Sequence, residues 1–257
     1  MLILKNVHSF DVSFETAKKI QKELLGLVNI SDSGLKPDDI GFVGGIDVSF
    51  IEPGLNRFQK KTVKCPAQKE KNTDNKTIAL AGIVVYDVKK GNVAEKAFAV
   101  SEINFPYIPG FLSFREGPAV LKAMMELSRL PGVIIYDGCG IAHPRGLGIA
   151  SHLSVLTGIP FIGCAKSLLC GICGEPGKLK GAWTEIIYKE KIVGCCLRTR
   201  NNVKPVYVSP GSGMSIKEAR DFVLSLALKF RLPEPTRLAH NFVTEEKRNY
   251  LKNNSFL

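Results

Sequence analysis

Residues 133–166, VIIYDGCGIAHPRGLGIASHLSVLTGIPFIGCAK, decide the fold class of this chain. The apolar run VIIY predicts a buried strand, and PFIGCAK predicts a second one. Between these two runs, GLGIASHLSVLTG predicts a helix. Strand and helix units that alternate along a chain indicate an α/β fold, in which helices pack on the faces of a sheet.

The segments on either side of this stretch extend the sheet. Upstream, IGFVGGIDVSF (40–50) predicts a buried strand, and residues 77–103 predict two antiparallel strands that are joined at Lys90–Asn92. A second hairpin is expected at 182–199. Further helices are expected at about 13–28, 119–130 and 215–231. These elements together predict a central mixed β-sheet flanked by helices.

We find no internal repeat and no linker, so a single domain is expected over residues 1–257. Its last part, from about 241 to 257, is polar and is expected to form a frayed tail. A basic, polar insert at about 57–76 interrupts the predicted strands and is expected to form a loop.

The composition restricts the class of protein. Of the 257 residues, 45% are hydrophobic, which is enough for a substantial core. No apolar run is long enough to span a membrane, and the first residues lack the features of a signal peptide, so a cytoplasmic protein is expected. The seven cysteines lie scattered in apolar runs and fit free thiols in a reducing compartment. A net charge of +11 favours a polyanionic partner over a merely solvated basic surface.

The tetrapeptide DVSF occurs twice, and its two copies have different surroundings. The first copy begins a predicted helix, so Asp11 or Ser13 has an ordinary role as the helix cap. The second copy lies within an apolar, strand-like run. A buried carboxylate is costly there unless a cation or a hydrogen-bond donor compensates its charge. Asp47 is therefore the copy that we expect to carry chemistry.

Two other acidic residues complete a possible cluster. Glu116 precedes a predicted helix, and Asp137 ends the strand VIIY. Since the carboxyl ends of neighbouring strands converge on one edge of a sheet, these carboxylates and Asp47 could together hold a hard cation such as Mg²⁺. Glu116 could instead stabilise a helix N-terminus, and Asp137 could form a turn before Gly138.

His143 and Lys166 follow the acidic residues along the chain. Lys166 closes the strand PFIGCAK and is expected at the same edge as Asp137, where its charge would offset the carboxylates and contact a phosphate. The glycine series in YDGCGIAHPRGLG suggests a rival, a phosphate-binding loop, but it matches neither nucleotide-binding fingerprint. CGIC (170–173) has the C-x-x-C spacing without two further zinc ligands nearby, which favours buried structural thiols.

Four blocks of the chain resemble, in order, the signatures of the endonuclease V family of deoxyinosine-directed nucleases. They are VGGIDVSF, FPYIPGFLSFREGP, VIIYDGCGIAHPRGLGIASHLSVLTGIPFIGCAKSLL and RLPEPTRLAH. The similarity extends from about Phe14 to about His240 with compatible spacing. PYIPG followed by FREGP is especially specific, because no general structural requirement explains it.

The resemblance implies a ribonuclease H-like fold with a metal-dependent active site. It makes Asp47 and Asp137 direct ligands of Mg²⁺, for which Mn²⁺ can substitute, and Glu116 the residue that completes the acidic site. One or two cations would make a water nucleophilic and stabilise the leaving oxyanion. Whether one or two are bound does not follow from the sequence.

The resemblance also implies basic residues beside the scissile phosphate. His143 and Lys166 correspond to the family's basic pair, and His240 to a position near the active site where the family carries Asp or His. One departure concerns the late Ser-x-Gly-His block, where VSPGSGMS has Ser212 in place of the histidine. A role that depends on that histidine, such as positioning the late helix, therefore does not carry over to this chain.

The implied substrate is inosine in DNA or RNA, cut at the second phosphodiester bond 3′ to the lesion to leave 3′-hydroxyl and 5′-phosphate ends. A rigid wedge would fill the gap that the flipped base leaves, and the hypoxanthine would enter a narrow pocket. The implied residues are Tyr107, Ile108 and Pro109 for the wedge and Gly110, Leu112, Gly138 and Ala165 for the pocket.

Several alternatives stay open beside a DNA repair enzyme. The same site could serve an inosine-specific endoribonuclease or an excision-type nuclease of the same fold, although the latter normally belongs to a longer chain. A binding module that has lost catalysis is disfavoured, because all five implied catalytic positions are present. A monomer that binds inosine-containing nucleic acid and no membrane is expected.

Overall fold

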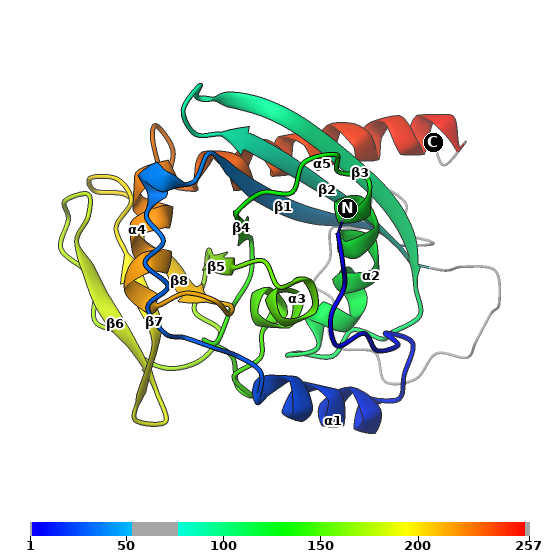
Figure 1. The fold of residues 1–257 in the computed structure, drawn as a ribbon, viewed down its shortest axis with the longest axis horizontal. Coiled ribbons are helices and arrows are strands. Elements are labelled where there is room, and N and C mark those ends of the chain that lie inside the picture. Colours follow the sequence, from blue (N-terminus) through cyan, green and yellow to red (C-terminus); the bar gives the residue numbers. More distant parts are fainter. Residues whose placement is uncertain (1, 53–76, 255–257) are drawn as a thin grey trace, which may run out of the picture.

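The computed structural model describes residues 2–52 and 77–254, so the insert predicted at 57–76 and Cys65 lie outside the described residues. Its centre is an eight-stranded mixed sheet with the order β3-β2-β1-β4-β5-β8-β7-β6 (Figure 1). The strands are β1 (Phe42–Ile51), β2 (Thr77–Asp87), β3 (Asn92–Ile103), β4 (Val133–Tyr136), β5 (Phe161–Ala165), β6 (Trp183–Tyr188), β7 (Lys191–Leu197) and β8 (Val206–Pro210). The predicted mixed sheet is thus confirmed, with β8 as a strand that the sequence reasoning missed.

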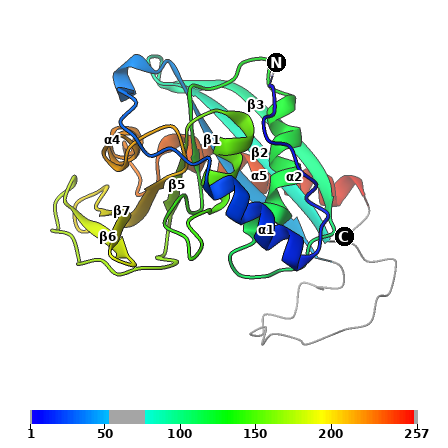
Figure 2. The ribbon, with the colours of Figure 1, turned by 60° about the horizontal axis from the view of Figure 1, so that its bottom comes forward.

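The helices cover both faces of this sheet. They are α1 (Phe14–Leu25), α2 (Leu112–Met125), α3 (Ile149–Thr157), α4 (Ile216–Leu226) and α5 (Glu234–Asn253), with a short 3₁₀ helix, η1 (Pro37–Asp39). α2 and α3 lie on one face and α4 and α5 on the other, while α1 runs along the outside of α3 (Figures 1 and 2). None of the helices in the described ranges has the length and apolar composition needed to span a lipid bilayer.

Alternate residues of the central strands supply two separate cores, as the pleat of a strand requires. Ile134 and Tyr136 pack in the core beneath α2 and α3, together with Ile46. Val133 and Ile135 pack in the opposite core, beneath α4. Because β4 is buried on both faces, its sequence is continuously apolar rather than alternating.

The parallel part of the sheet determines where the acidic residues lie. β1 pairs with β4, and β4 with β5, in parallel register, and the last paired residues of β1 and β4 are Ile46 and Tyr136. Asp47 and Asp137 are the next residues of these two strands. They therefore occupy equivalent positions where β4 ends, while β1 continues to Ile51.

Helix α5 packs unusually close to the sheet. A Cβ atom on Gly45 of β1 would overlap the backbone of Pro235, and one on Gly82 of β2 would overlap the side chain of Val243. The absence of side chains at these glycines lets α5 approach β1 and β2 directly. His240, one helical turn before Thr244, is thereby brought to the end of the sheet beside Asp47.

Several predicted helix boundaries were wrong. α2 and α4 end at Met125 and Leu226, before the predicted residues 130 and 231. α2 begins at Leu112, not near residue 119, so Pro118 lies inside the helix and Glu116 in its first turns rather than before it. Residues 241–253, predicted as a frayed tail, continue helix α5. The first helix ends at Leu25 and is capped by Ser13, whose side chain accepts a hydrogen bond from the Thr16 amide.

Candidate active site

Asp47 is a largely buried carboxylate, and His240 of helix α5 supplies a hydrogen-bond partner that offsets the cost of burying it. Its side chain is 15% exposed, and its Oδ2 lies 3.0 Å from Nδ1 of His240. Burial raises the pKa of the Asp47 carboxyl, while the His240 hydrogen bond works against this rise. The other copy of the tetrapeptide has no such environment, because Asp11 is exposed and accepts a hydrogen bond from Asn104 at 3.1 Å.

Asp137 and Lys166 form an ion pair at the carboxyl ends of neighbouring strands. Nζ of Lys166, which follows β5, contacts Oδ2 of Asp137, which follows β4. The lysine side chain is about half exposed. Lys166 therefore lies where the sequence predicted it, with its charge set against the carboxylates and its end accessible to a ligand.

Glu116 reaches the same region from helix α2 on the opposite side of the sheet. It is buried, and its Oε2 accepts a hydrogen bond from the Tyr136 hydroxyl at 2.5 Å. Burial raises the pKa of Glu116 to about 8, and the negative charges of Asp47 and Asp137 add to this effect. The charges of Asp47 and Asp137 are thus close enough to act on the buried Glu116 carboxyl.

These carboxylates are the type of ligand that a divalent cation takes, but their side chains do not form a complete coordination site in this structure. Among the described residues, no three His, Cys, Asp or Glu side chains are grouped as metal ligands. Asp47 instead faces His240 and Asp137 faces Lys166. Mg²⁺ prefers oxygen ligands. A cation would also offset the negative charges of Asp47 and Asp137, which add to the effect of burial on the pKa of Glu116.

A pocket of about 420 Å³ opens beside Asp137 and Lys166. Its walls come from the loop before α2, the segment between β4 and α3, and the end of β5. The predicted substrate-binding residues all line it: Tyr107, Ile108, Pro109, Gly110, Leu112, Gly138 and Ala165. Asp137, His143 and Lys166 line it as well, whereas Asp47 and Glu116 do not. One cavity therefore joins the predicted wedge and base pocket to part of the acidic site.

The loop of the predicted wedge is held at Gly110, whose φ of +81° is in the left-handed region that favours glycine. The Gly110 carbonyl accepts hydrogen bonds from Gln21 at 2.9 Å, from Arg145 at 2.5 Å and from the His143 ring at 3.1 Å. Gln21 also accepts a hydrogen bond from Nε of Arg145 at 2.6 Å. Three donors on a single carbonyl fix the end of this loop against α1 and the segment after β4.

His143 therefore differs from the expected basic group. Its Nδ1 accepts a hydrogen bond from the Arg145 amide at 3.2 Å, which leaves Nε2 to donate to the Gly110 carbonyl. Burial, helped by the charge of Arg145, lowers the pKa of His143 to about 4. In this structure His143 is a neutral donor that supports the pocket wall, and Lys166 supplies the positive charge.

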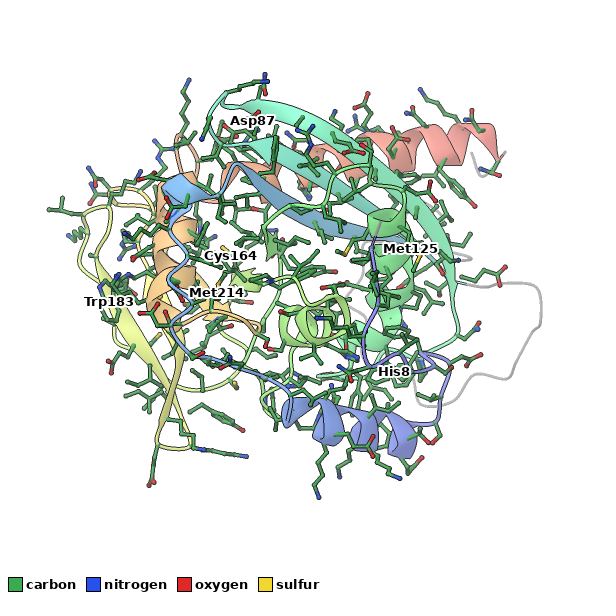
Figure 3. The ribbon with its side chains drawn as sticks, in the orientation of Figure 1. His8, Asp87, Met125, Cys164, Trp183 and Met214 are labelled. Atoms are coloured by element: carbon green, nitrogen blue, oxygen red, sulfur yellow. The ribbon has the colours of Figure 1, made fainter. Side chains whose placement is uncertain are left out.

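Ser113, a pocket residue that sequence reasoning missed, ends a buried chain of hydrogen bonds. A carbonyl oxygen only accepts, so Nδ1 of His8 donates to the Ser9 carbonyl. Nε2 of the neutral His8 ring is then an acceptor, and Nε2 of His152, 2.6 Å away, donates to it. The remaining nitrogen of His152 then accepts from the Ser113 hydroxyl at 2.8 Å. Burial lowers the pKa of His152 to about 3, which keeps this chain neutral. His8 belongs to the N-terminal segment (Figure 3), and its hydrogen bond to His152 ties this segment to α3.

Other residues outside the predicted set also support the site. Arg145 and Gln21 fix Gly110, and the Arg115 guanidinium lies 5.8 Å from the centre of the Tyr107 ring. Arg115 and Arg145 fall within the quoted blocks REGP and HPRG, so the sequence carried a signal for them. Gln21 has none, because a single glutamine in an amphipathic helix is ordinarily a solvent-facing residue.

Ser212 has a structural contact of its own. Its hydroxyl accepts a hydrogen bond from the Asn29 amide at 3.0 Å, and its carbonyl accepts one from Ser154. It therefore joins the segment after α1 to the loop that follows β8. The late helix α4 is positioned by a different device, a capping box between Ser215 and Glu218.

The six cysteines in the described residues are free, as expected. Cys164, Cys195 and Cys196 are buried, and Cys164 lies at the centre of the sheet (Figure 3). Cys170 and Cys173 are only half-buried, which corrects the expectation of buried thiols for CGIC. No three His, Cys, Asp or Glu side chains in the described part of the chain are grouped there as zinc ligands.

A mixed sheet of this order, with Asp47 within β1 and Asp137 directly after β4, has the ribonuclease H-like fold of the endonuclease V structures. The model of the endonuclease V family matches residues 22–241. The chain belongs to the endonuclease V family. It is therefore an endonuclease of DNA repair that cleaves on the 3′ side of inosine lesions, in a family that generally uses a divalent metal.

Relatives of known sequence and structure agree with this assignment. The endonuclease V of Dictyoglomus turgidum is 41% identical over 227 residues, which cover 88% of each chain. The crystal structure of the Bacillus subtilis endonuclease V is similar with a TM-score of 0.84 and 30% identity, covering 97% of this chain and 99% of that one. The Ciona intestinalis endonuclease V is similar with a TM-score of 0.73 and 25% identity, covering 92% and 98%, and was solved with a 24mer DNA that contains an inosine followed by a ribo-adenosine.

Proposed function

We propose that this protein is a Mg²⁺-dependent endonuclease that binds inosine-containing DNA and hydrolyses the second phosphodiester bond 3′ to the inosine, leaving 3′-hydroxyl and 5′-phosphate ends. Mn²⁺ substitutes for Mg²⁺. The observation that carries this proposal is the single pocket that Tyr107, Gly138, Asp137 and Lys166 line together. If a flipped base entered this pocket, the sugar-phosphate backbone of the same DNA strand would lie beside the acidic residues. The DNA complex of the Ciona relative supports the substrate class.

Asp47 and Asp137 would hold the divalent metal, and Glu116 would complete its acidic surroundings. When bound there, such a cation makes an attacking water nucleophilic and stabilises the leaving oxyanion. The supporting geometry is the equivalent position of Asp47 and Asp137 on the parallel strands β1 and β4. Tyr136 holds the Glu116 carboxyl by its hydroxyl, so that this residue stays directed at the same end of the sheet.

Lys166 and His240 act around this acidic pair. The half-exposed ammonium of Lys166 lies at the pocket wall and would contact a phosphate oxygen of the bound strand. His240 holds the Asp47 carboxylate through Nδ1 and so orients it. His143 acts differently, since its neutral ring holds Gly110 in place and keeps the wall of the base pocket rigid.

Lesion recognition would use the loop before α2. Tyr107 is 72% exposed, with Ile108 and Pro109 after it, so an aromatic ring stands at the mouth of the pocket without burying itself in the protein. This residue would occupy the space that the flipped nucleotide leaves. Flipping costs less at a mismatched base, which itself favours a deaminated site. Gly110, Leu112, Gly138 and Ala165 would let backbone groups approach the hypoxanthine ring closely.

The test is cleavage of matched DNA and RNA oligonucleotides that each carry one inosine, with the cut position mapped. We expect a cut at the second bond 3′ to inosine in DNA when Mg²⁺ is present and none with a chelator. Asp137→Asn should remove cleavage while retaining the melting temperature. Preferential cutting of RNA would instead assign an endoribonuclease, and equal cutting of adenine and inosine substrates would refute the lesion specificity.

A separate variant tests the wedge. Because the Tyr107 side chain is largely exposed, Tyr107→Ala should leave stability unchanged and reduce the preference for inosine over adenine substrates. Binding of inosine DNA should weaken by about tenfold, because the lost stacking contact contributes ~1–3 kcal/mol. An unchanged preference would remove Tyr107 from lesion recognition.

We further propose that the protein acts as a cytoplasmic monomer. Measurement of its molecular mass in solution would check the monomeric state.

A further inference from the structure

A second cavity, of about 540 Å³, adjoins the base pocket. The two cavities share the segment Lys166–Leu168, which follows β5 and forms the ridge between them. The other walls of the second cavity come from the segment between β5 and β6, the segment between β7 and β8 with the start of β8, and the loop between α4 and α5. We call this cavity the basic cleft, because its charged lining residues are Lys166, Glu175, Arg198, Lys204 and Arg231.

The carboxylate of the basic cleft is already neutralised. Glu175 pairs with Arg198 at 2.6 Å, and the same guanidinium donates to the carbonyls of Pro176 at 2.8 Å and Gly177 at 3.0 Å. Arg198 is therefore a structural residue that closes one wall. Lys166 is paired with Asp137. The charges of the cleft that remain to attract a ligand are therefore those of Lys204 and Arg231, both positive.

Arg231 is held in place but keeps an unused donor. Its NH2 group donates to the carbonyls of Lys166 at 3.0 Å and Pro205 at 2.6 Å. Its buried Nε has no hydrogen-bond partner among the described residues. A buried donor without a partner is costly unless a ligand or water satisfies it. Lys204, next to Pro205, is exposed at the mouth of the cleft.

The strand order shows where the basic cleft lies along the sheet relative to the acidic residues. Along the sheet, Asp47 lies on β1, the base pocket opens beside β4 and β5, and the basic cleft lies beyond them at β8 and β7. The cleft and Asp47 are thus on opposite sides of the base pocket. If the nucleotides 3′ of the inosine run from the base pocket to the carboxylates, the nucleotides 5′ of the inosine point towards the basic cleft.

We propose that the basic cleft is a phosphate subsite that binds the backbone of the substrate strand on the 5′ side of the inosine, through Lys204 and Arg231. This inference rests on the proposed function, because the direction follows from cleavage 3′ to the lesion at the acidic residues. The ligand is the phosphodiester group, which DNA and RNA share. Lys166 lies between the two cavities and contacts the backbone at their junction.

The experiment measures equilibrium binding of a single-inosine oligonucleotide as a function of salt, with Lys204→Gln and Lys204→Glu compared with wild type. Loss of one phosphate contact should lower the slope of log K against log salt by about 0.7–0.9. Lys204→Glu should bind several-fold more weakly than Lys204→Gln at low salt. Lys89→Gln, an exposed lysine of the turn between β2 and β3 on the other half of the sheet, is the matched control and should bind like wild type.

Shortened substrates then locate the contact. Removing the nucleotides 5′ of inosine should abolish the difference between wild type and Lys204→Gln, whereas removing distant 3′ nucleotides should preserve it. Unchanged binding and salt slope in both Lys204 variants would overturn the proposal, and so would an effect that depends on the 3′ nucleotides. Cleavage by wild type at saturating substrate tests the proposed function separately, since the Lys204 variants should still cut there at the same bond.

Discussion

At the scale of single residues, the two copies of DVSF have the same local sequence but lie in different environments. Asp11 is exposed and makes a local contact with Asn104. Asp47 is largely buried, and burial raises the pKa of its carboxyl. The sequence was sufficient to separate the two, because an acidic residue inside an apolar strand lacks the usual roles in capping and turns.

The two aspartates provide a matched pair of variants. Asp47→Asn keeps the size of the side chain and the contact with His240 but removes the charge, so we expect cleavage of inosine DNA to fall by at least about 10³-fold, equivalent to ~4 kcal/mol. Asp11→Asn, in the same tetrapeptide, should cut at the wild-type rate. Single-turnover rates measure both, and comparable rates in the two variants would contradict the role of Asp47.

The roles of the histidines were less predictable. The sequence indicated a basic His143 near the phosphate, which stays a prediction. In the structure its ring is hydrogen-bonded to the Gly110 carbonyl in the pocket wall, and burial lowers its pKa to about 4. No pattern in the sequence pointed to the pair of His8 and His152, because these residues are far apart along the chain and meet only when the N-terminal segment packs on α3.

The buried His152 predicts a pH dependence of stability. Its pKa is about 3 in the folded chain against an ordinary 6.5, so the unfolded chain binds more protons between these values. The free energy of unfolding should therefore fall as the pH is lowered from about 6.5 towards 3, by at most ~1.4 kcal/mol per pH unit for this proton.

Urea unfolding at several pH values measures this slope. His152→Gln offers an amide that can donate to His8 and accept from Ser113 without titrating, so its unfolding free energy should depend less steeply on pH below 6.5. Wild-type and variant slopes that coincide would show that His152 is protonated in the folded chain.

At the scale of elements, β1, β4 and the hairpin β2–β3 could be predicted because their apolar runs and turn are local features. Helix α5 could not, since its residues are mostly polar and only a narrow stripe that includes Ala239 and Val243 is buried. What holds α5 is close contact with glycines on β1 and β2, which only the folded sheet reveals. The extension of α2 back to Leu112 is similar, because Phe111 and Phe114 pack in a core with Ala17 of α1.

The docking of α5 can be tested through Gly45. A Cβ atom in Gly45→Ala would overlap the backbone of Pro235, so we expect a loss of stability of about 1–3 kcal/mol and displacement of His240 from Asp47. Gly41→Ala, just before β1, meets no atom within 4 Å and should be tolerated. Urea unfolding compares the two, and equal stabilities would refute the tight contact.

At the scale of the whole molecule, the site is assembled from segments that are far apart along the chain. The base pocket combines the loop before α2 with the segments after β4 and β5, while the acidic residues come from β1, α2 and β4. Sequence motifs identified most members of this site. They placed Lys166 at the same edge of the sheet as Asp137. They could not indicate that Asp47 would face His240, because that pairing depends on how α5 packs beside β1.

The central claim is that Asp47 and Asp137 hold one divalent cation between neighbouring parallel strands. Crystals grown with Mn²⁺ test it most directly, because the anomalous scattering of manganese locates the ion without assumption about its ligands. We predict a peak in contact with both carboxylates, with the Asp137–Lys166 pair opened. A manganese ion bound elsewhere, away from both Asp47 and Asp137, would contradict the account.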